Sequence, residues 1–267
     1  MRVRIIFQLK NRGAYVPFHH QYLLAQTIRG VLARGGNREF LNSEGYNFSG
    51  LKGQTRISRK GLHFFSARVT LVFSAATREF LDHFSGLLLQ MKGLQVGNML
   101  LQPERIEPET VPALAESGKF LCISPLVLLP GVFQDETGKR FISPDTDEFS
   151  DLLYEQTMAR MAASGRFSES ALKEFYRFQL VPDRDYLSKL EENNKKFSRI
   201  YPMFDSDIRY EVRGYTFPFT LFAAPPVQQF VYEHGLGLLS HKGFGMLDLA
   251  GHHPVIQDSE QELQQYA

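Results

Sequence analysis

The sequence predicts an α+β fold in which the element order β-α-β-β-α-β occurs twice along the chain. Apolar residues alternate with polar ones in the predicted strands and recur at helical spacing in the predicted helices. A stretch rich in proline and acidic residues separates the two series near the middle of the 267 residues. This order corresponds to tandem ferredoxin-like units, the arrangement on which RNA-recognition motifs are also built.

The first unit is predicted over residues 1–117. Val3, Ile5 and Phe7 alternate with polar residues and indicate an opening strand, and Gly35-Gly36 ends the first helix. Thr77 is a typical first residue of a helix because its hydroxyl can accept a backbone N–H. The predicted elements are a strand over 3–9, a helix over 19–34, an edge strand over 54–58, one long strand over 61–73, a helix after residue 77 and a closing strand over 94–100.

The second unit is predicted over residues 118–255. Residues 103–118 are expected to be a linker because they contain three prolines and four acidic residues. The elements that follow are strands over 120–129, 175–181, 208–223 and 244–249, with helices over 145–163 and 225–235. The remaining tail, 256–267, is rich in Gln, Asp and Glu, and we expect it to be disordered.

Composition excludes several classes of protein. The single cysteine, Cys122, excludes an internal disulfide framework and a cysteine-rich zinc site. No apolar stretch approaches the ~20 residues that cross a bilayer, and the opening Arg2-Val3-Arg4 is unlike a secretory leader. No HExxH or HxxxH pattern occurs, so we expect neither a metal site nor a cofactor. The expectation is a soluble cytoplasmic protein with no membrane partner.

Charge is distributed unevenly along the chain. Residues 1–80 contain 13 Lys or Arg and three acidic residues, a net charge of +10, whereas residues 81–267 have a net charge of −9. Such segregation creates a positive field on a protein whose total charge is only +1. The first unit is therefore suited to a polyanion, and nucleic acid is the first candidate.

The most specific motif is a glycine loop between the last predicted helix and the last strand. Two Gly-x-Gly units, Gly235-Leu236-Gly237 and Gly243-Phe244-Gly245, are separated by five residues that include His241 and Lys242. Glycine allows close approach of the backbone, and exposed N–H groups can bind phosphate. The loop does not match the Walker A motif or the dinucleotide fingerprint, because it lies between a helix and a strand in that order.

This loop resembles the hallmark of the RAMP superfamily. The segment 16–22, with the sequence Val-Pro-Phe-His-His-Gln-Tyr, and Ser124-Pro125 are similar to the sixth CRISPR-associated protein family, the endoribonucleases that cut CRISPR repeat RNA. The resemblance covers residues 1 to about 251. It implies tandem ferredoxin-like domains, binding of repeat RNA, and cleavage without a metal or cofactor that leaves a 2′,3′-cyclic phosphate and a 5′-hydroxyl.

The catalytic residues depart from the pattern of that family. Many members have a histidine in the loop after the first helix, a tyrosine in that helix and a lysine slightly later. Here residues 35–52 contain no histidine, Asn42 lies near its expected place, and Arg29 occupies the place of the tyrosine. Histidine suits proton transfer, and Lys or Arg suits stabilisation of the phosphorane charge. The candidates are His20, His19, Arg29, Tyr46 and Lys52.

The RNA-binding candidates come from both units. Arg56, Arg59 and Lys60 form a basic cluster beside the predicted edge strand. The glycine loop, which we expect either to contact RNA or to brace the domain interface beside it, contributes Gly235, Gly237, His241, Lys242, Gly243, Phe244 and Gly245.

Two other functions remain open. The first is a non-catalytic repeat-RNA-binding subunit of a CRISPR effector complex, which the missing loop histidine favours; other effector subunits, or a second copy of the chain, are then possible partners. The second is a module that binds a small metabolite, but this function does not explain why positive charge is concentrated in residues 1–80.

Overall fold

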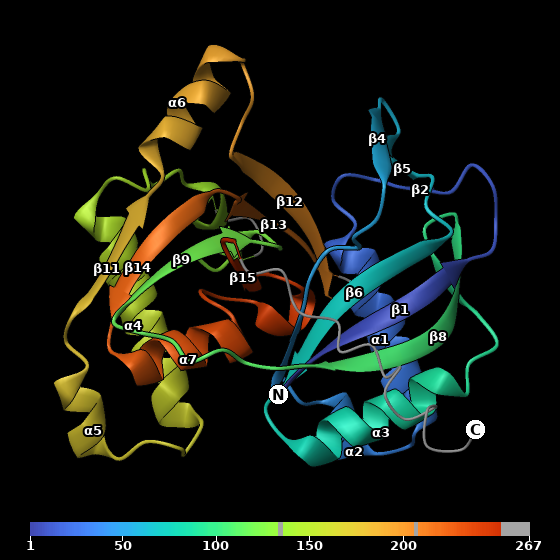
Figure 1. Cartoon of the computed structure of the whole chain (residues 1–267), viewed down its shortest axis with the longest axis horizontal. Coiled ribbons are helices and arrows are strands. Elements are labelled where there is room, and N and C mark those ends of the chain that lie inside the picture. Colours follow the sequence, from blue (N-terminus) through green and yellow to red (C-terminus); the bar gives the residue numbers. More distant parts are fainter. Residues whose placement is uncertain (133–135, 206–207, 252–267) are drawn as a thin grey trace, which may run out of the picture.

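The computed structural model describes residues 1–132, 136–205 and 208–251, and the tail predicted over 256–267 lies outside the described residues. Figure 1 shows two α+β halves side by side. The main sheet of the first half has the strand order β3-β6-β1-β8-β7, and every neighbouring pair is antiparallel. Its elements are β1 (Arg2–Leu9), α1 (Gln21–Arg34), α2 (Arg38–Leu41), β3 (Tyr46–Phe48), β6 (Arg68–Ala75), α3 (Arg78–Leu89), β7 (Leu94–Val96) and β8 (Met99–Glu109).

Helices α1 and α3 cover one face of this sheet because each has an apolar stripe. Leu24, Ile28 and Val31 of α1 are buried together with Phe80 and Phe84 of α3. Thr77 caps α3 as expected, since its hydroxyl accepts the Phe80 N–H. Burial of these stripes fixes the start of α1, which is where the candidate histidines lie.

The long strand predicted over 61–73 is in fact two strands in different sheets. β5 (Gly61–Phe64) pairs with β2 (Tyr15–Val16) and β4 (Thr55–Ser58) in a small separate sheet, and β6 pairs with β1. Phe65, which lies inside the predicted strand, is 65% exposed at the break. The same alternation continues across both strands, so the pattern does not reveal the change of partner.

The linker predicted over 103–118 is also wrong, because β8 continues to Glu109 and β9 begins at Ser117. The strand accommodates Pro103 and Pro108 because β7 pairs with β8 only as far as Leu101. Beyond that residue β8 is an edge strand with β1 as its one partner in the described sheet. Proline is tolerated on such an edge, because no neighbouring strand on that side needs the N–H that proline lacks.

The second half contains a four-stranded sheet, β11-β14-β9-β15, and a three-stranded sheet, β10-β13-β12. Helices α4 and α7 pack on the larger sheet through a core that includes Phe149, Leu153 and Val231. The elements are β9 (Ser117–Cys122), β10 (Leu126–Val127), η1 (Thr137–Lys139), α4 (Asp147–Ala163), α5 (Glu169–Glu174), β11 (Phe178–Pro182), α6 (Arg184–Glu192), β12 (Ser198–Asp205), β13 (Ile208–Tyr215), β14 (Pro218–Ala223), α7 (Pro225–His234), η2 (Ser240–Lys242) and β15 (Leu247–Leu249).

Two further strand predictions must be divided. The strand expected over 120–129 breaks at Ser124-Pro125 into β9 and β10, and the one expected over 208–223 breaks at Thr216-Phe217 into β13 and β14. In both cases the two pieces belong to different sheets. The sequence analysis also missed β12, α5 and α6. Pro202 obscured β12, which tolerates the proline because it is an edge strand.

Arg2 of β1 joins the two halves. Its side chain is fully buried, forms an ion pair with Glu109, and donates to the carbonyl of Leu247 at 2.6 Å. The guanidinium also lies 4.2 Å from the centre of the Tyr232 ring and 3.6 Å from Asp248 Oδ1. The start of the first half is thereby fixed to α7 and β15 of the second.

We predict that Arg2→Met lowers the free energy of unfolding by about 3–5 kcal/mol, because Asp248 and the carbonyls of Leu247 and Tyr232 lose their buried partner. Chemical denaturation measures this loss. Arg78→Met is the control, since the Arg78–Asp82 ion pair is exposed and its loss costs less than about 0.5 kcal/mol. Equal, small losses in both variants would show that Arg2 does not fix the halves.

Candidate nucleic-acid interface

The four glycines of the loop lie too close to other protein atoms to leave room for a Cβ atom. All four have φ between +76° and +84°. A Cβ atom on Gly245 would lie 2.0 Å from the Leu236 carbonyl oxygen, and one on Gly237 would lie 2.5 Å from that of Val127. The Leu236 N–H donates to the Gly245 carbonyl at 2.8 Å, so the two Gly-x-Gly units pair with each other.

The loop also packs against the first half. A Cβ on Gly243 would lie 2.3 Å from the ring of Phe48, and one on Gly235 would lie 2.1 Å from Asn47. Phe244 is fully buried, with its ring 5.5 Å from that of Tyr201. The four glycines and Phe244 thus face protein, and their positions favour bracing of the two halves over the direct RNA contact predicted from the sequence. Glycine serves both kinds of close approach, so the motif did not distinguish them.

Arg160 of α4 holds the same loop from the other side. Its guanidinium donates to the carbonyls of His234 at 2.5 Å, Gly235 at 2.8 Å and Gly237 at 3.1 Å. Burial lowers the pKa of Arg160 to about 10, which leaves the guanidinium charged at neutral pH. The first of these bonds satisfies the last carbonyl of α7, which has no partner within the helix, and the other two hold the first Gly-x-Gly unit of the loop.

The two polar residues at the tip of the loop lie on η2 and are half-buried. Lys242 Nζ is 3.0 Å from the hydroxyl of Tyr210 and lies over its ring. His241 Nε2 is 3.7 Å from Glu44 Oε1, and its ring is 6.5 Å from that of Tyr46. Both side chains therefore already have protein neighbours on either side of the seam between the halves.

Tyr46, Lys52 and Arg29 are not among the residues that line the open cavity described below. Tyr46 is 8% exposed and stacks with Phe73 and Phe80, and burial raises its pKa to about 12. Lys52 forms an ion pair with Asp248 at 3.2 Å. Arg29 is on the exposed face of α1, on the side nearest Tyr46. These positions give Tyr46 a packing role and leave Arg29 and Lys52 as surface cations.

The two candidate histidines differ in access. His20 is 4% exposed; its Nδ1–H donates to the Pro17 carbonyl at 3.0 Å, while Nε2 is buried without a partner in the described structure and faces Gly50. His19 is half-buried, and its ring packs edge-on against Tyr201 at 4.9 Å. Burial, followed by the charge of Arg199, lowers the pKa of His19. At neutral pH its imidazole is therefore neutral and can accept a proton.

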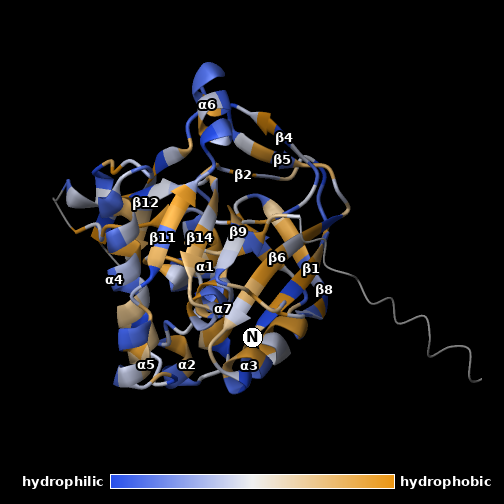
Figure 2. Cartoon of the chain, turned by 60° about the vertical axis from the view of Figure 1, so that its left-hand side comes forward, coloured by the Kyte–Doolittle hydropathy of each residue, from blue (hydrophilic) through white to orange (hydrophobic). Residues whose placement is uncertain are grey.

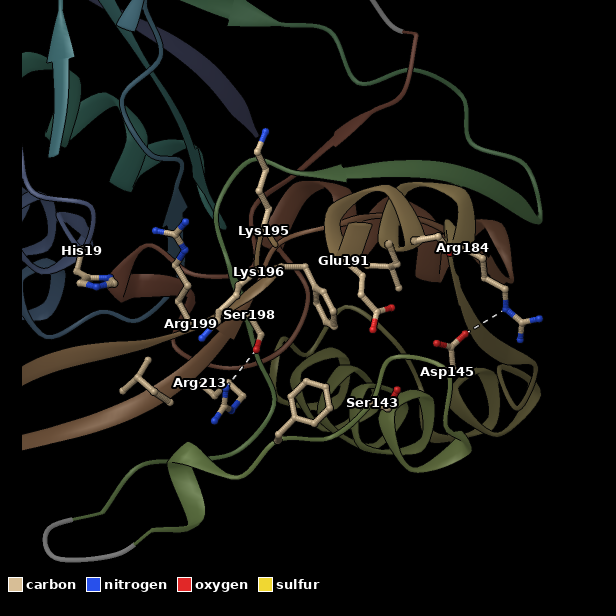
Figure 3. A pocket seen from close by; sticks show the side chains of 15 residues that line it. His19, Ser143, Asp145, Arg184, Glu191, Lys195, Lys196, Ser198, Arg199 and Arg213 are labelled. Carbon is tan, nitrogen blue, oxygen red and sulfur yellow. Dashed lines mark hydrogen bonds and ion pairs between the residues drawn. The ribbon is translucent and has the colours of Figure 1, made fainter. Parts of the chain in front are cut away.

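His19 lies at the edge of an open cavity of about 1120 Å³ between α6 and β12 (Figure 3). The cavity is lined by five Lys or Arg side chains and two carboxylates. Figure 2 shows α6 as mostly hydrophilic, and none of its residues is buried. The cationic members are Arg184, Lys195, Lys196, Arg199 and Arg213.

Arg199 connects the cavity to the first half. Its guanidinium lies 5.6 Å from the centre of the Phe18 ring, next to His19. The structure therefore brings a histidine from the start of α1 and an arginine from β12 together at one edge of a cationic cavity. Sequence analysis missed Lys195, Lys196, Arg199 and Arg213. The dibasic pair inside an otherwise acidic half was the one signal that could have indicated them.

The basic cluster Arg56, Arg59 and Lys60 is exposed at the β4–β5 turn. Figures 1 and 2 both place this hairpin at the same end of the molecule as α6. A polyanion that enters the cavity at His19 would therefore find further positive charge on the hairpin.

Two other features are absent from the part of the chain that the structure describes. No group of three or more His, Cys, Asp or Glu there is arranged to hold a metal ion. No helix of that part is long and apolar enough to cross a bilayer.

Several solved structures share this fold along nearly the whole chain. A "CRISPR associated protein Cas6" is 21% identical with a TM-score of 0.73, and covers 94% of this chain and 99% of its own. "An RAMP protein binding different RNA substrates" is 18% identical with a TM-score of 0.74, over 94% and 99% of the two chains. A Cas6-related protein from Pyrococcus furiosus is 18% identical with a TM-score of 0.74, over 95% and 99%. The predicted tandem ferredoxin-like fold is thus confirmed.

The sequence itself matches the family described as "CRISPR associated protein Cas6, C-terminal" over residues 107–249. No curated protein sequence matches at a significant level. Because the family match covers more than half of the chain, the protein belongs to the CRISPR-associated Cas6 family.

Proposed function

We propose that the chain binds CRISPR repeat RNA and cleaves the precursor transcript into guide RNAs. Membership of the Cas6 family supports the substrate class. The observation that carries the site is the placement of His19 beside Arg199 at the edge of a cationic cavity. The resemblance of the sequence to repeat-processing endoribonucleases supports the reaction.

The RNA backbone runs from the β4–β5 hairpin to the rim of the cavity in this proposal. Arg56, Arg59 and Lys60 are exposed on the hairpin, and Lys195 and Lys196 are exposed on the rim. Exposed cations that release counterions from phosphates supply a large part of nucleic-acid affinity. The two clusters belong to different halves, so this path requires that the halves keep a fixed position and orientation relative to each other.

Cleavage proceeds by attack of the RNA 2′-hydroxyl on the adjacent phosphorus. His19 accepts the 2′ proton, because burial and Arg199 keep its imidazole neutral at neutral pH. Arg199 stabilises the added charge of the phosphorane. The bond to the 5′-oxygen then breaks, and this oxygen takes a proton from a solvent water, which leaves a 2′,3′-cyclic phosphate and a 5′-hydroxyl. His19 returns the 2′ proton to the solvent. His20, whose Nδ1–H is bonded to the Pro17 carbonyl, positions the segment that carries His19.

A second function, repeat-RNA binding without cleavage, is favoured by one observation. Tyr46 is buried and Lys52 is ion-paired with Asp248, so two of the candidates named with the family pattern already have structural roles. In that case the chain would hold repeat RNA as part of a larger effector complex. A cleavage assay on labelled RNA that carries the repeat of the neighbouring array distinguishes the two functions.

We predict that alanine at Arg56, Arg59 and Lys60 together weakens RNA binding and lowers the slope of log K against log salt by about 2, or ~0.7 for each lost phosphate contact. Titrations at several salt concentrations measure the slope. Alanine at Arg38, Arg78 and Lys92, three exposed cations around α2 and α3, is the control with the same charge change. Equal slopes in the two triple variants would exclude the hairpin.

We predict that His19→Ala slows cleavage of the repeat RNA by about 10²- to 10⁴-fold in excess EDTA while the affinity for RNA changes little. Arg199→Ala should slow cleavage and also move the rising limb of the pH–rate profile to higher pH, because the arginine lowers the pKa of His19. Single-turnover rates across a pH series measure both effects.

His20→Ala is the comparison for this experiment. It should lower thermal stability, because His20 is buried, and it should leave the pH profile in place. Full activity of His19→Ala would reject His19 as the base. Absence of cleavage by the wild-type chain, together with specific repeat binding, would favour the non-catalytic function.

A further inference from the structure

Phe141 presents an aromatic surface inside the cationic cavity. The ring lines the cavity and its residue is 50% exposed, which is high for a phenylalanine inside a folded half. Phe197 and Tyr215 contact it, with ring centres at 6.2 and 6.1 Å. Its neighbours therefore hold the ring in position while half of the side chain remains open to the cavity.

Arg213 adds a fixed planar cation to this surface. Its guanidinium carbon lies 5.6 Å from the centre of the Phe141 ring. Nε donates to the Lys139 carbonyl at 2.7 Å, and a terminal nitrogen donates to Ser198 Oγ at 3.2 Å (Figure 3). Because these bonds orient the guanidinium before any ligand arrives, little side-chain entropy is lost when a ligand stacks beside it.

The charge around this surface suits a nucleotide that belongs to a longer strand. Lys195 and Lys196 line the same cavity as Phe141, where they can bind the phosphates on either side of a stacked base. Of the two carboxylates, Asp145 is neutralised by Arg184 at 3.1 Å. Sites for single strands combine a cationic groove with aromatic side chains in this way, and arginine adds to the stacking.

We propose that Phe141 and Arg213 form a stacking site for one unpaired nucleobase of the bound RNA, next to the reaction site at His19. The inference rests on the proposed RNA-binding function. A base within a duplex has both faces covered by its neighbours and cannot stack on the ring. The cavity, at about 1120 Å³, has room for an unpaired base with its flanking phosphates. The site thus requires a single-stranded segment of the RNA at this point.

The test compares a labelled oligo(A) RNA decamer with a decamer of the same ribose-phosphate chain that lacks bases. Phe141→Ala should weaken binding of oligo(A) by about 5- to 150-fold, the effect of losing one stacked base. It should leave the affinity for the abasic decamer and the salt dependence unchanged. Phe141→Tyr should restore most of the affinity for oligo(A), because it restores an aromatic face.

Tyr176→Ala is the matched control. Tyr176 is 68% exposed with Arg177 at 5.8 Å from its ring centre, but it does not line the cavity, so its loss should not change binding. Equal affinities of wild type and Phe141→Ala for oligo(A), or equal losses on both decamers, would overturn the stacking site. Failure of the wild-type chain to bind either decamer at low salt would instead contradict the proposed RNA-binding function itself.

Discussion

The seam between the two halves is the constraint on which the proposed site depends. Neither half carries the site alone, because His19 precedes α1 whereas Arg199 belongs to β12. Two sets of contacts close the seam: the buried guanidinium of Arg2 on Asp248 and the Leu247 carbonyl, and the glycine loop against Phe48 and Asn47. Substitutions in either set are expected to be destabilising. Loss of Arg2 would leave buried polar groups without a partner, and a Cβ atom in place of a loop glycine would have no space. A fixed relation between the halves keeps the histidine and the arginine beside each other without a ligand to assemble them.

Charge is organised on two scales in this molecule. The net charge of +10 over residues 1–80 provides a broad positive field, to which the exposed β4–β5 hairpin belongs. The second half is acidic overall, yet Lys195, Lys196 and Arg199 gather on the wall that faces His19. In the proposed function, the broad field attracts RNA to this end of the molecule, and the local cluster positions a phosphate there.

The sequence was sufficient for the order of the main elements, because α1, α3 and α7 have clear helical periodicity and recognisable ends such as Thr77 and Gly235. It was insufficient where the chain passes from one sheet to another while the alternation of apolar and polar residues continues, as at Phe65. Glycine spacing revealed a close approach but not its partner, which is Phe48 and backbone rather than RNA in the described structure. The cavity was missed because Arg199 and Arg213 come together with His19 only when β12 and β13 pair beside the first half. Contacts between distant segments of this kind have no local signature.

The most direct measurement of the central claim is a crystal structure of the chain with repeat RNA that carries a 2′-deoxy nucleotide 5′ of the scissile phosphate, which prevents cleavage. The account predicts that this phosphate lies between the two halves, within hydrogen-bond reach of the Arg199 guanidinium, with His19 directed at the missing 2′-hydroxyl. The halves should keep the relation they have here, with Arg2 and the glycine loop unmoved. A scissile phosphate bound at Arg29 and Lys52, away from His19, or a seam that opens to admit the RNA, would contradict it.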